Sequence, residues 1–246
     1  MQRHGGALTA RVRDMRILII SDVHANIEAL QALKEPYDYL LCLGDLVDYG
    51  PSPREALAFL QERASYVVRG NHDAAVGYHV DCQCVQPYRE LSIATRDYMW
   101  QVLDEEHLAY LRRLPVNQAQ VLGGARFYLC HAAPSNNLYR YLPYDSPDTV
   151  WQDEAARVQA DFIFIGHTHQ QFVKPVGQKT FVNPGSLGQP KGVGPVACYA
   201  IWEDGQVELK RMPYPFRETM AKIDDSPLAP DIKEKLKMVL ERGVLG

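Results

Sequence analysis

Short apolar runs recur along the chain, and each of them ends in polar residues. Five such runs are RILIIS at 16–21, YLLCLG at 39–44, YVVRG at 66–70, RFYLC at 126–130 and DFIFIG at 161–166. Compact runs of β-branched, leucine and aromatic residues are typical of strands that are buried on both faces. The pattern therefore predicts five buried strands.

Helical patterns lie between several of these runs. Residues 52–63 begin with SPRE, where Ser52 fits an N-cap, Pro53 fits the first turn and Glu55 completes a capping box. Residues 146–160 repeat the Ser-Pro start. A strand followed by a helix and another strand indicates a largely parallel sheet.

The region 74–115 is also mostly helical by pattern, with Asp104 as a cap before EEHLAYLRRL. It interrupts the series of strands, so we interpret it as a helical insertion. An insertion at this position is able to overhang a site, although ordinary crossover structure explains the pattern equally well.

The last part of the chain has a different character. QFVKPV, KTFVN, VACYAIW and QVELKRM follow one another after residue 170 with turn residues between them, which predicts strands joined by hairpins in a second sheet. A final helix at about 230–242 carries apolar residues on one face and ends at Gly243. We expect an α/β fold (α+β by some schemes) of two packed mixed sheets flanked by helices. Residues 15–246 are expected to form one domain, after a disordered extension of residues 1–14.

Composition narrows the class of protein. The formal net charge is -4 over 246 residues, which argues against a nucleic-acid partner. No apolar run approaches the roughly 20 residues needed to span a bilayer, and the first residues lack the apolar middle of a secretory signal. We therefore expect a cytoplasmic enzyme or binding protein without a membrane partner.

Five cysteines are present, and two of them form CQC at Cys82 and Cys84. This pair fits half of a metal site or a strained disulfide, but a second pair that would complete a zinc ribbon is missing. We favour reduced thiols without a structural role.

Residues with metal-binding or acid-base side chains follow all five predicted strands. They are Asp22 and His24 after the first, Asp45 and Asp48 after the second, Asn71 and His72 after the third, His131 after the fourth, and His167 and His169 after the fifth. Because ligands of α/β sheets bind outside the carboxyl ends of the strands, we expect these side chains to converge on one rim. A histidine that merely caps a strand end explains any one of them singly, but not five together.

The donor types point to a metal centre. Carboxylates, imidazoles and an amide carbonyl suit Mn, Fe, Zn or Ni better than ions that prefer thiolates, and we favour Mn. The ligands are too many for one open catalytic ion. They suffice for two divalent ions that share a bridging carboxylate.

The ordered motifs DVH, GDLVD, GNHD, H and GHTH across residues 22–169 resemble those of the calcineurin-like metallophosphoesterases. The stretches GDLVDYGPSP, RGNHDAAV, HAAP and NPGSLGQPK make the chain similar to the small bacterial phosphodiesterase-like branch of that superfamily. The resemblance implies a four-layer sandwich and a hydrolase acting on phosphoric ester bonds. One such motif is weak, whereas all five in order are highly specific.

Carried over by position, the resemblance implies two metal sites with Asp45 as the bridge. Asp22, His24, Asp45 and His169 would hold the first ion, and Asp45, Asn71, His131 and His167 the second. A hydroxide that bridges the metals would attack phosphorus. His72 would be the general acid and Asp48 the residue that orients it, while Asp73 would hydrogen-bond the turn.

The expected substrate is a small phosphodiester or phosphomonoester. Tyrosines near the site offer stacking surfaces for a nucleotide, although packing explains them as well. Tyr49 stands where Ser/Thr protein phosphatases carry an arginine, which argues against a protein substrate. A nuclease or nucleotide hydrolase using the same site is the main alternative. A binding scaffold without turnover is disfavoured, because a scaffold would be expected to have lost ligand positions.

Overall fold

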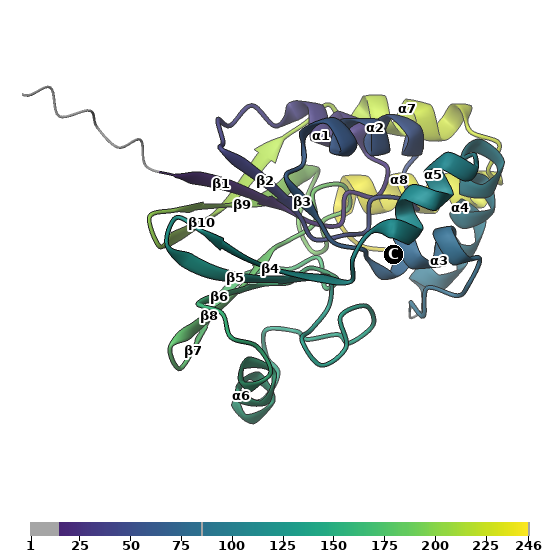
Figure 1. Ribbon diagram of the computed structural model, residues 1–246. Helices are drawn as coiled ribbons and strands as arrows, with labels where there is room; N and C mark the ends of the chain where they lie inside the picture. The colour runs from purple at the N-terminus through teal and green to yellow at the C-terminus, as the bar shows by residue number, and fades with distance from the viewer. Residues whose placement is uncertain (1–14, 85, 246) are drawn as a thin grey trace, which may run out of the picture.

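The computed structural model describes residues 15–84 and 86–245, so the extension predicted for residues 1–14 lies outside the described residues. Two mixed five-stranded sheets form the centre of the molecule (Figure 1). Sheet A has the order β10 (Gln206–Pro213), β9 (Val196–Glu203), β1 (Arg16–Ile20), β2 (Tyr39–Cys42) and β3 (Tyr66–Val67). Sheet B has the order β4 (Asn117–Leu122), β5 (Ala125–Cys130), β6 (Phe162–Phe164), β8 (Lys179–Pro184) and β7 (Gln171–Val176).

The prediction that the last four strands form their own sheet is wrong. The β9–β10 hairpin pairs antiparallel to β1, with Ile17 opposite Trp202, and so extends sheet A. The β7–β8 hairpin instead joins sheet B, because β8 pairs parallel to β6. An open edge next to a buried strand leaves backbone groups unpaired, and each hairpin covers one such edge. Sequence patterns identify hairpins but not the edge on which they pair.

Strand β4 was not predicted from its sequence, NQAQVL. It is an edge strand whose side chains alternate between exposed and partly buried positions until Leu122. Its polar composition hides it from a search for apolar runs.

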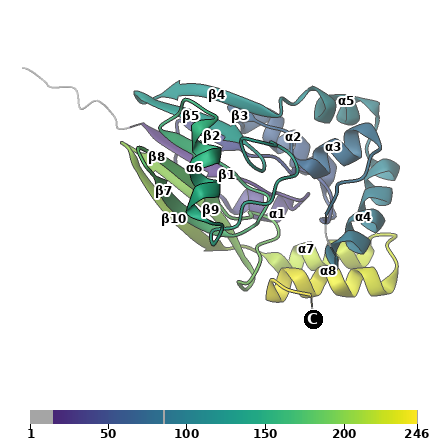
Figure 2. The ribbon, with the colours of Figure 1, turned by 90° about the horizontal axis from the view of Figure 1, so that it is seen from below.

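Four layers are visible in Figures 1 and 2. Helices α1 (Ile27–Ala32), α2 (Pro53–Arg63) and α7 (Phe216–Asp225) cover the outer face of sheet A, and α6 (Asp148–Ala156) covers that of sheet B. At the ends of the sheets lie α3 (Asn71–Tyr78), α4 (Tyr88–Val102), α5 (Glu105–Arg113) and α8 (Pro230–Arg242). This arrangement confirms the predicted fold of two packed mixed sheets with flanking helices.

The layers explain the apolar runs. Along β1, Ile17 and Ile19 pack between the sheets with Phe127 and Trp202, whereas Leu18 and Ile20 pack under the helices. Successive side chains of a strand point to opposite faces, so a strand covered on both sides is apolar throughout.

The predicted helix ends agree in part with the structure. Asp104 caps α5 by accepting hydrogen bonds from the backbone of Glu106 and His107, and α8 ends at Gly243 with a φ of 73°. The capping box predicted for α2 is wrong, because the Ser52 side chain makes no cap hydrogen bond. Its Oγ instead lies 3.4 Å from Nζ of Lys222 on α7.

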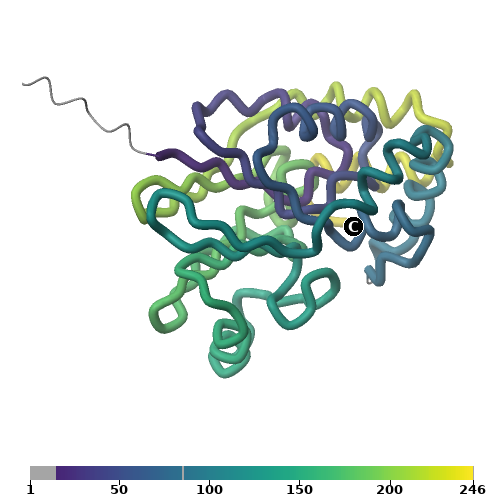
Figure 3. The backbone as a smooth tube through the Cα atoms, viewed as in Figure 1, coloured from purple at the N-terminus to yellow at the C-terminus, as the bar shows by residue number. Residues whose placement is uncertain are grey.

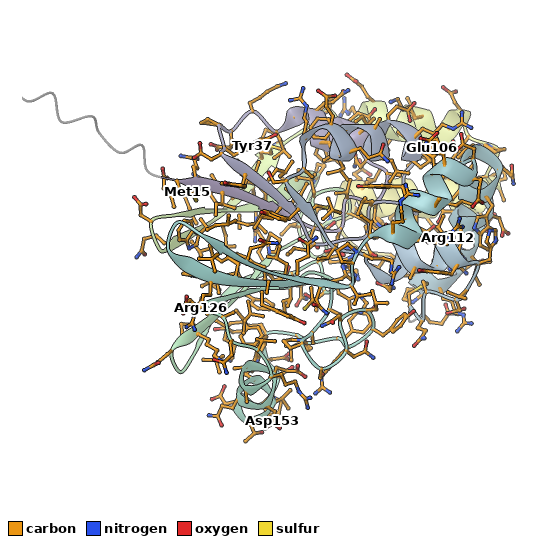
Figure 4. The ribbon with its side chains drawn as sticks, in the orientation of Figure 1. Met15, Tyr37, Glu106, Arg112, Arg126 and Asp153 are labelled. Atoms are coloured by element: carbon orange, nitrogen blue, oxygen red, sulfur yellow. The ribbon has the colours of Figure 1, made fainter. Side chains whose placement is uncertain are left out.

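The backbone path leads the strand ends toward one region. Figure 3 shows the loops after β1, β2 and β3 meeting near α3, and Figure 4 shows Met15 and Arg126 at the opposite end of the sheets.

The region predicted as an insertion carries α3, α4 and α5. The interpretation of residues 15–246 as one domain stays a prediction. Among the described helices, none has both the length and the apolar character that crossing a membrane requires.

Candidate metal centre

Six of the predicted ligands form two compact groups of buried side chains. Asp22, His24 and His169 offer donor atoms within 4.8 Å of one another, and so do Asp45, His131 and His167. The strands that carry them belong to two different sheets rather than to one parallel sheet. The side chains therefore converge where the carboxyl ends of both sheets meet, and not on the rim of a single sheet.

The backbone at these strand ends is unusual. Asp22, His24, Asp45, His167 and His169 have φ values of 53°, 48°, 55°, 65° and 60°. The left-handed region is sparsely populated by residues other than glycine, and such conformations cluster at functional sites. These turns direct the side chains into the space between the strand ends.

In the first group, backbone carbonyls fix the orientation of both rings. Nδ1 of His24 lies 3.2 Å from the carbonyl oxygen of Val47, and Nδ1 of His169 lies 2.6 Å from that of Gln189. Because each Nδ1–H donates to a carbonyl, the neutral rings present their Nε2 lone pairs to each other, at 3.3 Å.

The second group has the same design. Nδ1 of His131 lies 2.8 Å from the carbonyl oxygen of Leu43, while its Nε2 lies 3.1 Å from Oδ2 of Asp45 and 3.0 Å from Oδ1 of Asn71. The same Asp45 oxygen is 4.0 Å from Nε2 of His24 in the first group. Asp45 thus lies between the two groups.

Unpaired buried atoms test whether these groups suit metal ions. Oδ1 of Asp22 and Nε2 of His167 are buried without a hydrogen-bond partner among the described residues. An unpaired buried polar atom costs about 1–3 kcal/mol, so several at one place indicate a missing partner. A cation between facing lone pairs and carboxylate oxygens satisfies them all, and the residues fit divalent ions.

His72 and Asp48 form a pair beside the two groups. Nδ1 of His72 lies 2.7 Å from Oδ2 of Asp48, and the other carboxylate oxygen accepts from Thr95 Oγ1. Ser92 Oγ lies 3.2 Å from Oδ2. The position of Thr95 and Ser92 on α4 was not predicted, because no sequence pattern links them to the GDLVD motif.

Residues 15–204 match the calcineurin-like phosphoesterase superfamily domain. The chain belongs to the calcineurin-like phosphoesterase superfamily. It is accordingly a hydrolase that acts on phosphoric ester bonds, as its motifs predicted.

Three relatives illustrate the similarity. An uncharacterized protein of Methanocaldococcus jannaschii is 29% identical over 245 residues, which are 89% of this chain and 96% of the relative. Phosphodiesterase YfcE of Escherichia coli is 25% identical over 205 residues, which are 77% and 88% of the two chains. The crystal structure of a metallophosphoesterase from Sphaerobacter thermophilus has a TM-score of 0.75 at 28% identity and covers 92% of this chain and 99% of its own.

The electrostatics of this phosphoesterase divide the histidines into two kinds. Burial lowers the pKa of His167 to about 3, and His24 also lies well below its ordinary pKa because of burial and the neighbouring His169. Burial acts in the same direction on His72 and His131, but the Asp45 carboxylate outweighs it and raises their pKa values to about 10 and 9. The first kind is neutral at pH 7 and the second is protonated.

Asp73 hydrogen-bonds the turn, as predicted. Its Oδ2 accepts from the backbone N–H of Gly70 at 2.9 Å and of Asp45 at 2.8 Å, while Oδ1 accepts from Leu46 at 2.7 Å. Burial and the nearby Asp45 charge raise the pKa of Asp73 to about 6. This carboxyl joins the loop after β2 to the start of α3 and so holds Asp45 in place.

A cavity of about 100 Å³ opens beside the metal-binding groups of the phosphoesterase. Its lining comprises Asp45, Tyr49, His72, Cys84, Gln86, Tyr88, Tyr141, His167, His169, Gln189 and Lys191. The Tyr141 ring lies 3.9 Å from that of His167, and Nζ of Lys191 lies 4.8 Å above the Tyr88 ring. Gln86 and Gln189 were not predicted as cavity residues, although Gln189 lies within the NPGSLGQPK stretch.

Proposed function

We propose that this chain is a phosphoesterase that uses two divalent metal ions to hydrolyse small phosphodiesters or phosphomonoesters. The observation that carries the proposal is the position of Oδ2 of Asp45, 3.1 Å from His131 in one donor group and 4.0 Å from His24 in the other. A carboxylate in that position is suited to bridge two ions.

The ligand assignment follows the two groups. Asp22, His24, Asp45 and His169 would hold one ion, and Asp45, Asn71, His131 and His167 the other. Asn71 is included because its Oδ1 lies 3.0 Å from Nε2 of His131, while its amide group donates to the carbonyl of Cys82 at 2.8 Å. The set contains nitrogen and oxygen donors without a thiolate, which suits divalent ions such as Mn, Fe, Zn or Ni, and we propose Mn.

Two such ions, when bound, make a nucleophile available from water near neutral pH and neutralise charge on the phosphoryl oxygens. The chain itself supplies the proton. His72 is buried with its Nδ1 2.7 Å from Asp48, and this carboxylate favours the protonated ring, so His72 carries a proton to give to the leaving oxygen. His72 is therefore the general acid, and Asp48 positions its ring.

The cavity supports a small substrate. Its volume of about 100 Å³ is below the roughly 300–1,000 Å³ of typical ligand pockets, so it accommodates a phosphoryl group and the first atoms of its substituents. Lys191, Tyr49 and Tyr141 are among the residues that line it, and burial lowers the pKa of Lys191. The similarity to phosphodiesterase YfcE supports a diester among the substrates.

Reconstitution of the metal-free protein with Mn²⁺ tests the proposal. We expect bound Mn²⁺ and turnover of a nitrophenyl phosphate monoester or bis(nitrophenyl) phosphate. Asp45→Asn should lose both ions and activity, because it removes the shared oxygen ligand. Asp153→Asn is the matched control, since Asp153 is exposed on α6, far from the strand ends (Figure 4). Wild-type protein that binds both ions but hydrolyses neither ester would refute catalysis and leave a binding scaffold.

A further inference from the structure

The segment between α3 and α4 places two cysteines beside His72. Cys82 and Cys84 are free thiols with 1% and 6% relative exposure, on either side of Gln83 at a φ of 58°. The left-handed conformation of Gln83 reverses the chain between them. Both thiols are buried, while Gln83 between them is exposed.

Contacts hold this segment in place. The Cys82 carbonyl accepts a hydrogen bond from Nδ2 of Asn71 at 2.8 Å, and the Cys82 sulfur lies 3.0 Å from Ser92 Oγ on α4. The two sulfur atoms and one ring nitrogen of His72 all lie within 4.8 Å of one another. The second ligand pair that the CQC motif lacks in sequence is thus replaced in space by a histidine 10 residues earlier than Cys82.

We propose that His72, Cys82 and Cys84 form a further metal site, distinct from the two nitrogen- and oxygen-rich groups, for a thiophilic divalent ion such as Zn²⁺. Cysteine sulfur and histidine nitrogen are the donors of protein zinc sites, and three protein ligands leave a fourth position for a small molecule. His72 and Cys84 both line the cavity, so the site borders the space that a substrate would enter.

The site would regulate turnover, and this step rests on the proposed function. A ring nitrogen that is bonded to an ion has no lone pair for a proton, so a zinc-bound His72 is not an imidazolium. The general acid is then lost while the two catalytic ions keep all their ligands. Zn²⁺ at this site is therefore an inhibitor of the Mn²⁺-loaded enzyme, and chelation reverses the inhibition.

Simple packing is the competing explanation. Cys82, Cys84 and Ala75 form a small apolar cluster, and buried cysteine often serves only as a small hydrophobic residue. Packing alone predicts neither metal uptake nor thiolate ligation.

Titration of the metal-free protein with Co²⁺ distinguishes a metal site from simple packing. Co²⁺ bound to thiolates gives intense sulfur-to-metal charge-transfer absorption, whereas nitrogen and oxygen sites do not. We expect this absorption in the wild type and in Cys198→Ser, a buried cysteine of β9 that serves as control. Cys82→Ser and Cys84→Ser should lose the absorption, bind one ion fewer per chain, and weaken Zn²⁺ inhibition of the Mn²⁺-loaded enzyme by at least about 10-fold.

Absence of charge-transfer absorption in the wild-type protein would refute the proposed site. Absorption that persists in both Cys82→Ser and Cys84→Ser would refute it as well. If a variant fails to fold, alkylation of the wild-type protein with iodoacetamide takes its place, with the modified cysteines identified by mass spectrometry. Zn²⁺ should protect Cys82 and Cys84 from alkylation. Alkylation of both thiols in the presence of Zn²⁺ would reject the proposal. The absorption is independent of turnover. Absorption without ester hydrolysis would refute the proposed function alone, and hydrolysis without absorption would refute the site alone.

Discussion

Asp48 and His72 form a buried pair in which a carboxylate oxygen lies 2.7 Å from Nδ1 of the imidazole. Thr95 and Ser92 donate to the carboxylate, which compensates for its removal from water. This hydrogen bond fixes the plane of the ring, and Nε2 carries the proton that faces away from Asp48. His72 is therefore oriented before any substrate arrives.

Replacement of His72 by asparagine should lower kcat by about 10²–10⁴-fold, because the leaving oxygen then departs without a proton. Bound Mn²⁺, measured by elemental analysis, should stay at the wild-type level, since His72 belongs to neither catalytic donor group. His107→Asn is the matched control: His107 makes a similar contact with Asp104, 2.6 Å apart, on the surface of α5. Full activity in His72→Asn would contradict the assigned role.

Asp48→Asn should change the pH profile more than the metal content. Burial lowers the pKa of His72, whereas the hydrogen bond and the negative charge of Asp48 raise it. Without the Asp48 charge the pKa falls, so the protonated, active ring is lost at a lower pH. The basic limb of kcat against pH should move down by roughly 1–3 units, the usual effect of one close opposite charge.

The comparison for this profile is Asp104→Asn, which removes a carboxylate from an exposed histidine pair. An unchanged basic limb in Asp48→Asn would show that another group sets it.

The strand ends illustrate what the sequence could predict. A buried strand followed by Asp, Asn or His is visible as a pattern, so the residues that meet in the centre were identified before the fold was known. The pairing of β9 with β1 was not predicted, because an apolar run indicates that a strand is buried but does not indicate which strand lies beside it. The hydrogen bond from Thr95 to Asp48 could not be predicted either, because Thr95 lies 47 residues later, on a helix without a motif linked to Asp48.

Residues of the cavity wall show the same limit. Tyr141 belongs to the segment after β5 and reaches His167 only because the two sheets bring their strand ends together. Such contacts depend on loop paths, which turn residues restrict but do not determine.

Metal uptake should release protons in a way that depends on pH. Burial lowers the pKa of His131, but the Asp45 carboxylate outweighs it and raises the pKa to about 9. At pH 7 this ring must therefore lose a proton before it ligates, whereas His167, with a pKa of about 3, has none to lose. Mn²⁺ affinity should rise from pH 7 to about 9 and then level off.

Calorimetric titrations with Mn²⁺ in buffers of different ionisation enthalpy measure this release. His72→Asn protein is the appropriate background, because it removes the other strongly raised histidine. We expect proton release at pH 7 that declines above pH 9. Equal heats in all buffers at pH 7 would mean that His131 is already neutral or does not ligate.

Gly166 tests how closely the two sheets must approach. A Cβ at this position would lie 1.9 Å from Ser21 Oγ and 2.8 Å from Oδ2 of Asp22. The backbone N–H of Gly166 donates to the carbonyl of His131 at 2.7 Å, which restricts how far Gly166 can move. Gly166→Ala should therefore destabilise the fold by about 1–3 kcal/mol and displace Asp22.

Gly194 is the matched control, because no atom lies within 4 Å of a Cβ placed there. Gly194→Ala should change the free energy of unfolding by no more than about 0.5 kcal/mol. Urea denaturation and Mn²⁺ binding measure both effects. Since the clash involves Asp22 directly, Gly166→Ala should weaken metal binding even at temperatures where it remains folded. Wild-type Mn²⁺ affinity in a folded Gly166→Ala protein would show that the space at Gly166 does not control the position of Asp22.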